Sequence, residues 1–65
     1  MKLIINGEER EVSATNVLAL LAELGLNAAG TVVERNKVIV ERAAYQDTGL
    51  AEGDLVEIVR LVGGG

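Results

Sequence analysis

The chain has 65 residues, contains neither cysteine nor histidine, and carries a net charge of −4 at neutral pH. A chain of this size forms one domain, residues 1–65, with a thin stability margin because it buries only about 60% of its unfolded surface. The missing residue types exclude disulfides, thiolate metal sites and the commonest general base. The acidic balance argues against nucleic acid and suits a partner with a basic docking surface. Without a long apolar run or a signal-peptide pattern, we expect a cytoplasmic protein with no membrane partner.

The first predicted element is a β-hairpin. Residues 1–5 are rich in β-formers and end at Asn6-Gly7, a dipeptide that favours the type I′ turn because both of its positions require positive φ. The return strand is expected at residues 9–12. Strand alternation places Leu3 and Ile5 on the core side together with Val12, and it places Ile4 on the other face.

The second predicted element is a short helix from Val17 to Leu24, with Thr15 or Asn16 as its N-cap. Gly25 stands where a C′ glycine ends a helix, and Leu26 follows it as the expected apolar contact. The apolar positions of this segment recur at helical spacing, which predicts one stripe packed on the core. These positions are Val17, Leu20, Leu21 and Leu24.

The remaining strands are expected at residues 31–35, 38–40 and 55–61, with Ala43–Tyr45 as a helical turn and Leu50 as an apolar plug under a loop. One helix covers only one face of a sheet, so the order predicts an α+β fold with a mixed sheet of four to five strands. The last strand is the most apolar. We therefore expect it in the centre of the sheet, parallel to the first strand, with no internal repeat and no second domain.

The chain closes with a tail, residues 62–65, that follows the last strand without a polar linker. Glycine loses more conformational freedom on ordering than any other residue, so we expect Gly63 to Gly65 to be disordered in the free protein. A backbone without side chains can thread a narrow tunnel through Gly63 and Gly64. It would then present the charged Gly65 carboxylate to chemistry on another protein.

The acidic residues are interpreted as a solvated surface, since they occupy turns and exposed strand positions without convergent partners. The hydroxyl side chains have no histidine to activate them, and no phosphate-binding glycine motif is present. We therefore expect no catalytic residue, no metal site and no bound cofactor, and we do not expect an enzyme.

One surface feature points to a binding role. If Val56 and Ile58 face the helix, alternation directs Val59 and Leu61 to the other side of the sheet, beside an exposed Ile4. Apolar patches of this kind mark interaction sites. The competing interpretation is an ordinary scatter of surface aliphatic residues.

These stretches together resemble the ubiquitin-like β-grasp fold and, more narrowly, the ThiS family of sulfur carriers in thiamine biosynthesis. The resemblance covers essentially the whole chain. It rests on the stretch at residues 3–7 with its Asn-Gly turn, the helix at 17–24, the stretch at 33–36, and residues 52–59 leading into the terminal glycines.

The resemblance implies a cycle that partner proteins run. A ubiquitin-activating-like adenylyltransferase (ThiF type) would use ATP to adenylate the carboxylate of Gly65. A cysteine desulfurase route would supply the sulfur that turns the adenylate into a thiocarboxylate, and thiazole synthase (ThiG type) would take that sulfur. Ile4, Val59 and Leu61 would form the docking face for the activating enzyme.

Alternatives remain open at this point. The small subunit of molybdopterin synthase shares the fold and tail, and a protein modifier joined to lysines would also fit the tail. A non-covalent β-grasp interaction domain would keep the apolar patch but would not need a terminal Gly-Gly.

Overall fold

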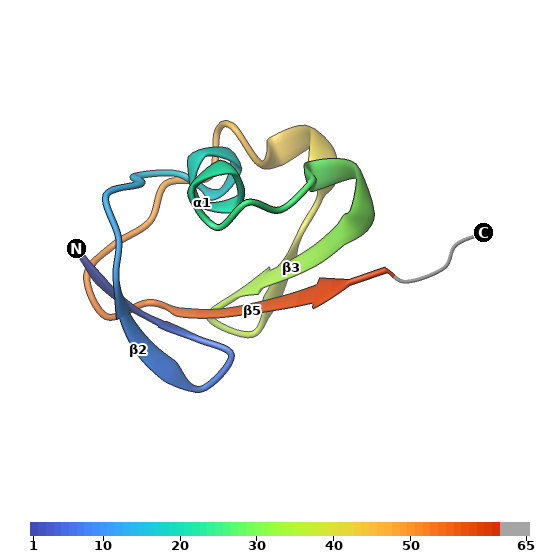
Figure 1. The fold of residues 1–65 in the computed structure, drawn as a ribbon. Coiled ribbons are helices and arrows are strands. Elements are labelled where there is room, and N and C mark those ends of the chain that lie inside the picture. The colour runs from blue at the N-terminus through green and yellow to red at the C-terminus, as the bar shows by residue number, and fades with distance from the viewer. Residues whose placement is uncertain (62–65) are drawn as a thin grey trace.

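The computed structural model describes residues 1–61, and Figure 1 shows one helix lying across one face of a sheet. The element order matches the predicted one, with short 3₁₀ turns η1 (Ala28–Gly30) and η2 (Arg42–Ala44) between the longer elements. The predicted helical turn at Ala43–Tyr45 therefore begins one residue earlier. The longer elements are β1 (Lys2–Ile5), β2 (Glu8–Glu11), α1 (Val17–Glu23), β3 (Thr31–Arg35), β4 (Val38–Val40) and β5 (Leu55–Arg60).

The sheet has five strands in the order β2-β1-β5-β3-β4. β5 is central, parallel to β1 and antiparallel to β3. The predicted mixed sheet and the predicted place of the last strand are therefore confirmed. The parallel pairing is short, because only Ile4 with Leu55 and Ile5 with Val56 are in register.

Both hairpin turns use backbone with positive φ. Asn6 and Gly7 have φ of 51° and 84°, and Asn36 and Lys37 have φ of 52° and 73°. Asparagine tolerates this region better than most residues, which explains its place at the first position of each turn. Lysine does not tolerate positive φ as glycine does, so the backbone of the Asn36-Lys37 turn is more strained than that of the Asn6-Gly7 turn.

Helix α1 is closed at both ends by local hydrogen bonds. The Asn16 side chain accepts from the backbone N–H of Ala19 at 2.7 Å, so Asn16 rather than Thr15 is the N-cap. Gly25 has φ of 74°. The N–H of Gly25 donates to Ala22 and that of Leu26 donates to Leu21, which is the Schellman pattern. The helix ends one residue before its predicted end, with Leu24 as C-cap.

The core lies between α1 and the inner face of the sheet. Leu3, Val17, Leu20, Val33 and Val56 are fully buried. The aromatic ring of the chain, Tyr45, is also buried, and its hydroxyl donates to the backbone carbonyl of Thr31 at 3.1 Å. The predicted core residues Leu3, Ile5 and Val12 are confirmed. Leu50 and Leu24 are partly buried against this cluster.

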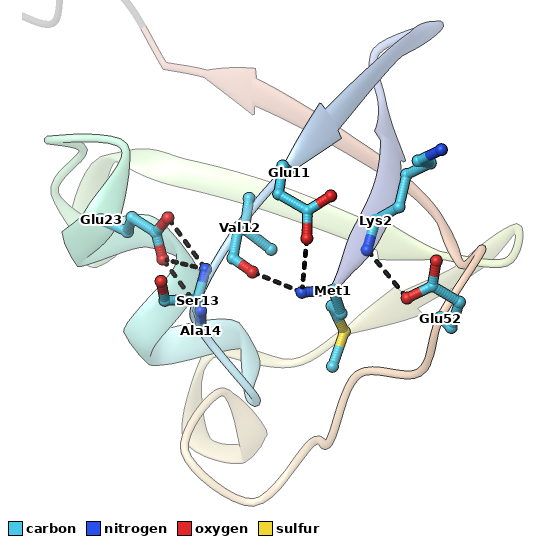
Figure 2. A network of polar contacts seen from close by, with 8 residues as sticks. All are labelled: Met1, Lys2, Glu11, Val12, Ser13, Ala14, Glu23 and Glu52. Atoms are coloured by element: carbon cyan, nitrogen blue, oxygen red, sulfur yellow. Dashed lines mark hydrogen bonds and ion pairs between the residues drawn. The ribbon is translucent and has the colours of Figure 1, made fainter.

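Three acidic side chains at the edges of the fold bind backbone N–H groups or the N-terminal ammonium group (Figure 2). Glu23, the last residue of α1, accepts from the N–H groups of Ser13 and Ala14 at 2.9–3.1 Å. Glu52 accepts from the N–H of Lys2 at 2.9 Å. The Met1 ammonium group donates to the Val12 carbonyl at 2.7 Å and pairs with Glu11 at 3.2 Å.

Candidate functional site

The candidate site is built on β5, the strand that leads into the terminal glycines. Its residues alternate, so that Val56 and Ile58 are buried under α1 whereas Leu55 and Val59 are exposed on the opposite side. We call this opposite side of the sheet the open face, because α1 leaves it uncovered (Figure 1). From the strand registers, its residues are Lys2, Ile4, Glu9, Glu11, Val32, Glu34, Ile39, Leu55, Glu57 and Val59, with Leu61 at its end.

The predicted docking residues occupy different parts of this face. Val59 and Leu61 are 59% and 58% exposed. Ile4 is half-buried rather than exposed, and its neighbour in register is Leu55. At about 3.3 Å per residue, the stretch from Leu55 to Leu61 covers about 20 Å. Ile4 therefore does not lie beside Val59 and Leu61, and the apolar surface is an elongated strip with Glu57 in its middle.

Leu61 is the last residue that the structure describes, and it is anchored. Its backbone N–H donates to the carbonyl of Gly30 at 2.8 Å, which continues the β3–β5 ladder by one residue beyond Arg60. The chain thus leaves the sheet from a fixed point beside the exposed Val59. The predicted modification residue Gly65 and the predicted threading residues Gly63 and Gly64 lie outside the described residues.

The start of β5 is fixed by a buried carboxylate that sequence reasoning assigned to the solvated surface. That assignment is wrong for Asp54, which is only 8% exposed. It accepts from Arg35 Nε at 2.7 Å, from the N–H of Ala51 at 2.8 Å and from Asn36 Nδ2 at 3.1 Å. Burial raises the pKa of Asp54, but these hydrogen bonds and the charge of Arg35 outweigh it and lower that pKa below its usual value.

Asn36 completes this junction. Its backbone N–H donates to the Leu55 carbonyl at 2.7 Å, and its side-chain oxygen accepts from the Leu55 N–H at 2.9 Å. The β3–β4 turn is therefore bonded directly to the first residue of β5. The sequence contains polar residues at both ends of this contact, Arg35-Asn36 and Asp54. They lie 18–19 residues apart, so no local pattern predicts that they bind each other.

The described residues contain no grouping suited to a metal ion. Within residues 1–61 no three side chains of the histidine, cysteine, aspartate or glutamate type converge. Over the same residues, no helix is long and apolar enough to cross a membrane. What the site offers is a partly apolar sheet face that ends at a bonded Leu61, an arrangement that suits docking.

A central β5 parallel to β1, with one helix on the inner face, defines the ubiquitin-like β-grasp class. The model of the ThiS family matches residues 3–65, and the chain belongs to this family. The crystal structure of the thiamine biosynthesis protein ThiS from Geobacter metallireducens has a TM-score of 0.84 at 36% identity, covering 100% of both chains.

Two kinds of named relatives are similar to the chain. The sulfur carrier protein ThiS of Bacillus subtilis is 44% identical over 46 residues, which cover 71% of this chain and 70% of that protein. A thiazole synthase of Paramagnetospirillum magneticum is 50% identical over 66 residues, which cover 100% of this chain but only 20% of that protein. The thiazole synthase of Magnetococcus marinus is 41% identical with the same coverage. The chain thus spans about one fifth of these synthases.

Proposed function

We propose that this chain is a sulfur carrier of thiamine biosynthesis that works through its C-terminal carboxylate. The observation that carries the proposal is the match to the ThiS family over residues 3–65, which includes the glycine tail as well as the fold. This match favours a ThiS-type carrier over the small subunit of molybdopterin synthase, over a protein modifier and over a non-covalent interaction domain.

The proposed chemistry begins on a partner. An oxygen of the Gly65 carboxylate attacks the α-phosphorus of ATP, and pyrophosphate leaves. A hydrosulfide equivalent from a cysteine desulfurase route then attacks the acyl carbon, and AMP leaves with the oxygen, so that a thiocarboxylate forms. ATP belongs to the adenylyltransferase, and the carrier itself binds no cofactor. A cycle that uses ATP is compatible with the cytoplasmic location expected from the sequence.

Two features of the chain support the role of substrate rather than enzyme. No cysteine or histidine is present to carry the sulfur or move a proton. The tail follows a strand that is bonded on both sides, which gives a partner a rigid body to hold while it acts on the terminus. The docking face in this proposal comprises Ile4, Val59 and Leu61, together with the part of the open face that lies between them.

Thiazole synthase is the proposed sulfur acceptor. Proteins named thiazole synthase contain a segment similar to this whole chain. A carrier-like segment within the same polypeptide as a synthase supports the proposal that the two act on each other.

The test is intact mass after incubation with the ThiF-type adenylyltransferase, ATP and a sulfide source. We expect the mass gain of an oxygen-to-sulfur exchange, mapped to Gly65. A variant without Gly65 should fold but gain no sulfur. Reacting atoms must approach to about 3–3.5 Å, and one residue of extended chain spans a similar distance.

A variant with one residue added after Gly65 is a second test, because it changes tail length in the other direction. It should also gain no sulfur. Thiocarboxylation of either variant at the wild-type rate, or sulfur on an internal residue, would refute the proposed function.

A further inference from the structure

Two glutamates face each other on the open face. Glu34 of β3 and Glu57 of β5 are directly opposite in the antiparallel register. The neighbouring bonds from Asn36 to Leu55 and from Leu61 to Gly30 make this a hydrogen-bonded pair, whose Cα atoms are about 5.5 Å apart. Like charges directly opposite one another destabilise a sheet. The free protein therefore carries a repulsive pair in the centre of its uncovered surface.

Neither glutamate is neutralised within the described chain. Among residues 1–61 the ion pairs are those of the Met1 ammonium with Glu11 and of Arg35 with Asp54. Lys37 lines the same hollow as the two glutamates, but it lies beyond ion-pair distance of both. Two negative charges and one positive charge leave the hollow with an excess of one negative charge.

Apolar side chains form part of the lining of the hollow. Ile4 and Leu55 line it beside the two glutamates, and its volume is about 150 Å³. Leu55 is 41% exposed, and Val59 continues the apolar surface toward the tail. A compact, strongly hydrated ammonium group loses water at such walls, whereas a guanidinium group is weakly hydrated and packs on apolar surface.

We infer that the hollow lined by Glu34 and Glu57 receives an arginine side chain of the adenylating partner, an inference that rests on the proposed function. The planar guanidinium presents donors along two edges and binds two carboxylates at once. Its charge removes the repulsion between the glutamates. The docking surface thereby gains a charged anchor in its centre, between apolar contacts at Ile4 and at Val59.

The experiment measures binding of the carrier to the purified ThiF-type adenylyltransferase without ATP, together with the KM and kcat for thiocarboxylate formation. The variants are Glu34→Gln, Glu57→Gln and the double variant. We expect Kd and KM to rise about tenfold for each single change, as for the loss of one charged hydrogen bond. The kcat should be unchanged, since the tail is untouched. The midpoint of urea unfolding should not fall in either single variant.

Two controls separate a local site from overall charge. Asp47→Asn removes one exposed negative charge away from the open face and should leave Kd unchanged. Lys37→Gln removes the one cation lining the hollow and should lower Kd, which a purely structural role of the glutamates does not predict.

The inference is overturned if the double variant binds like the wild type, or if Asp47→Asn weakens binding equally. Calcium or magnesium ions that bind the wild type tightly but not the double variant would assign the hollow to a metal instead. Glutamate-dependent binding without any thiocarboxylate would leave the arginine site standing and refute the proposed function.

Discussion

The side chain of Asn6 forms two hydrogen bonds with the backbone of Ile58. Its Oδ1 accepts from the Ile58 N–H at 2.8 Å, and its Nδ2 donates to the Ile58 carbonyl at 3.2 Å. The amide thus replaces the next residue of β1, which turns away at Asn6-Gly7. At the other end of the same seam, Glu52 and the N–H of Gly53 bond to the N–H and carbonyl of Lys2. The side chains of Asn6 and Glu52 and the N–H of Gly53 therefore extend a parallel pairing in which only two residue pairs are in register.

Asn6→Gly tests this relationship without backbone strain, because glycine adopts positive φ freely. We expect unfolding free energy to fall by about 1–2 kcal/mol, mainly from the two lost hydrogen bonds. Urea denaturation followed by circular dichroism measures it. The control is Lys37→Gly at φ of 73°, where no side-chain hydrogen bond is lost and the midpoint should rise. A midpoint for Asn6→Gly at or above that of the wild type would contradict the role given to Asn6.

Gly25→Ala probes the C-terminus of α1. The added methyl group meets no atom within 4 Å, but φ of 74° disfavours a side chain. We expect a loss of about 1 kcal/mol in unfolding free energy from the left-handed backbone. Gly30→Ala is the matched control, because the site is equally open and its φ is not positive. Equal unfolding midpoints for the two variants would show that the positive φ of Gly25 does not penalise a side chain at this position.

Asp54 makes stability depend on pH. Its folded pKa is lowered, so its contribution is fully present above the unfolded value of about 3.9 and is lost as pH falls through the folded pKa. Asp54→Asn should destabilise the protein at pH 7 by about 1.5–3 kcal/mol, since Arg35 and Ala51 lose a charged acceptor. The deficit relative to the wild type should shrink on acidification below about pH 4. Urea titrations across pH measure it, and a deficit that stays constant down to pH 2 would contradict the assignment.

Leu61→Asp tests the docking face at the root of the tail. Leu61 is 58% exposed, so the fold should be unaffected, whereas binding to the ThiF-type adenylyltransferase should weaken about tenfold or more. The control is Val38→Asp on edge strand β4. Val38 is 67% exposed and pairs in register with Arg35, so it lies on the side of the sheet away from the open face. Binding that is equally weak in both variants would indicate general charge repulsion rather than a local contact.

The sequence allowed the central place of the last strand, the Asn6-Gly7 hairpin and the C′ glycine of the helix to be predicted, because each has a recognisable pattern in the sequence. Asn-Gly, the C′ glycine and the apolar alternation of the last strand act within a few residues. The bonds of Asn6, Glu52 and Asp54 were not predicted. Glu52 and Lys2 are 50 residues apart, so only the folded sheet brings them together. The half-buried position of Ile4 was missed for the same reason, since it depends on the register of β1 against β5.

The seam between β1 and β5 also has a kinetic consequence. Asn6 and Ile58 are 52 residues apart in sequence, whereas each hairpin closes over only a few residues. Long-range parallel pairing is slow to form, and central strands exchange their amides only on global opening. The strand that carries Leu55, Glu57 and Val59 is thus in place only once the whole domain has assembled. A partner that binds the open face therefore acts on fully folded molecules and does not bind partly folded ones, even though both contain the same terminal glycines.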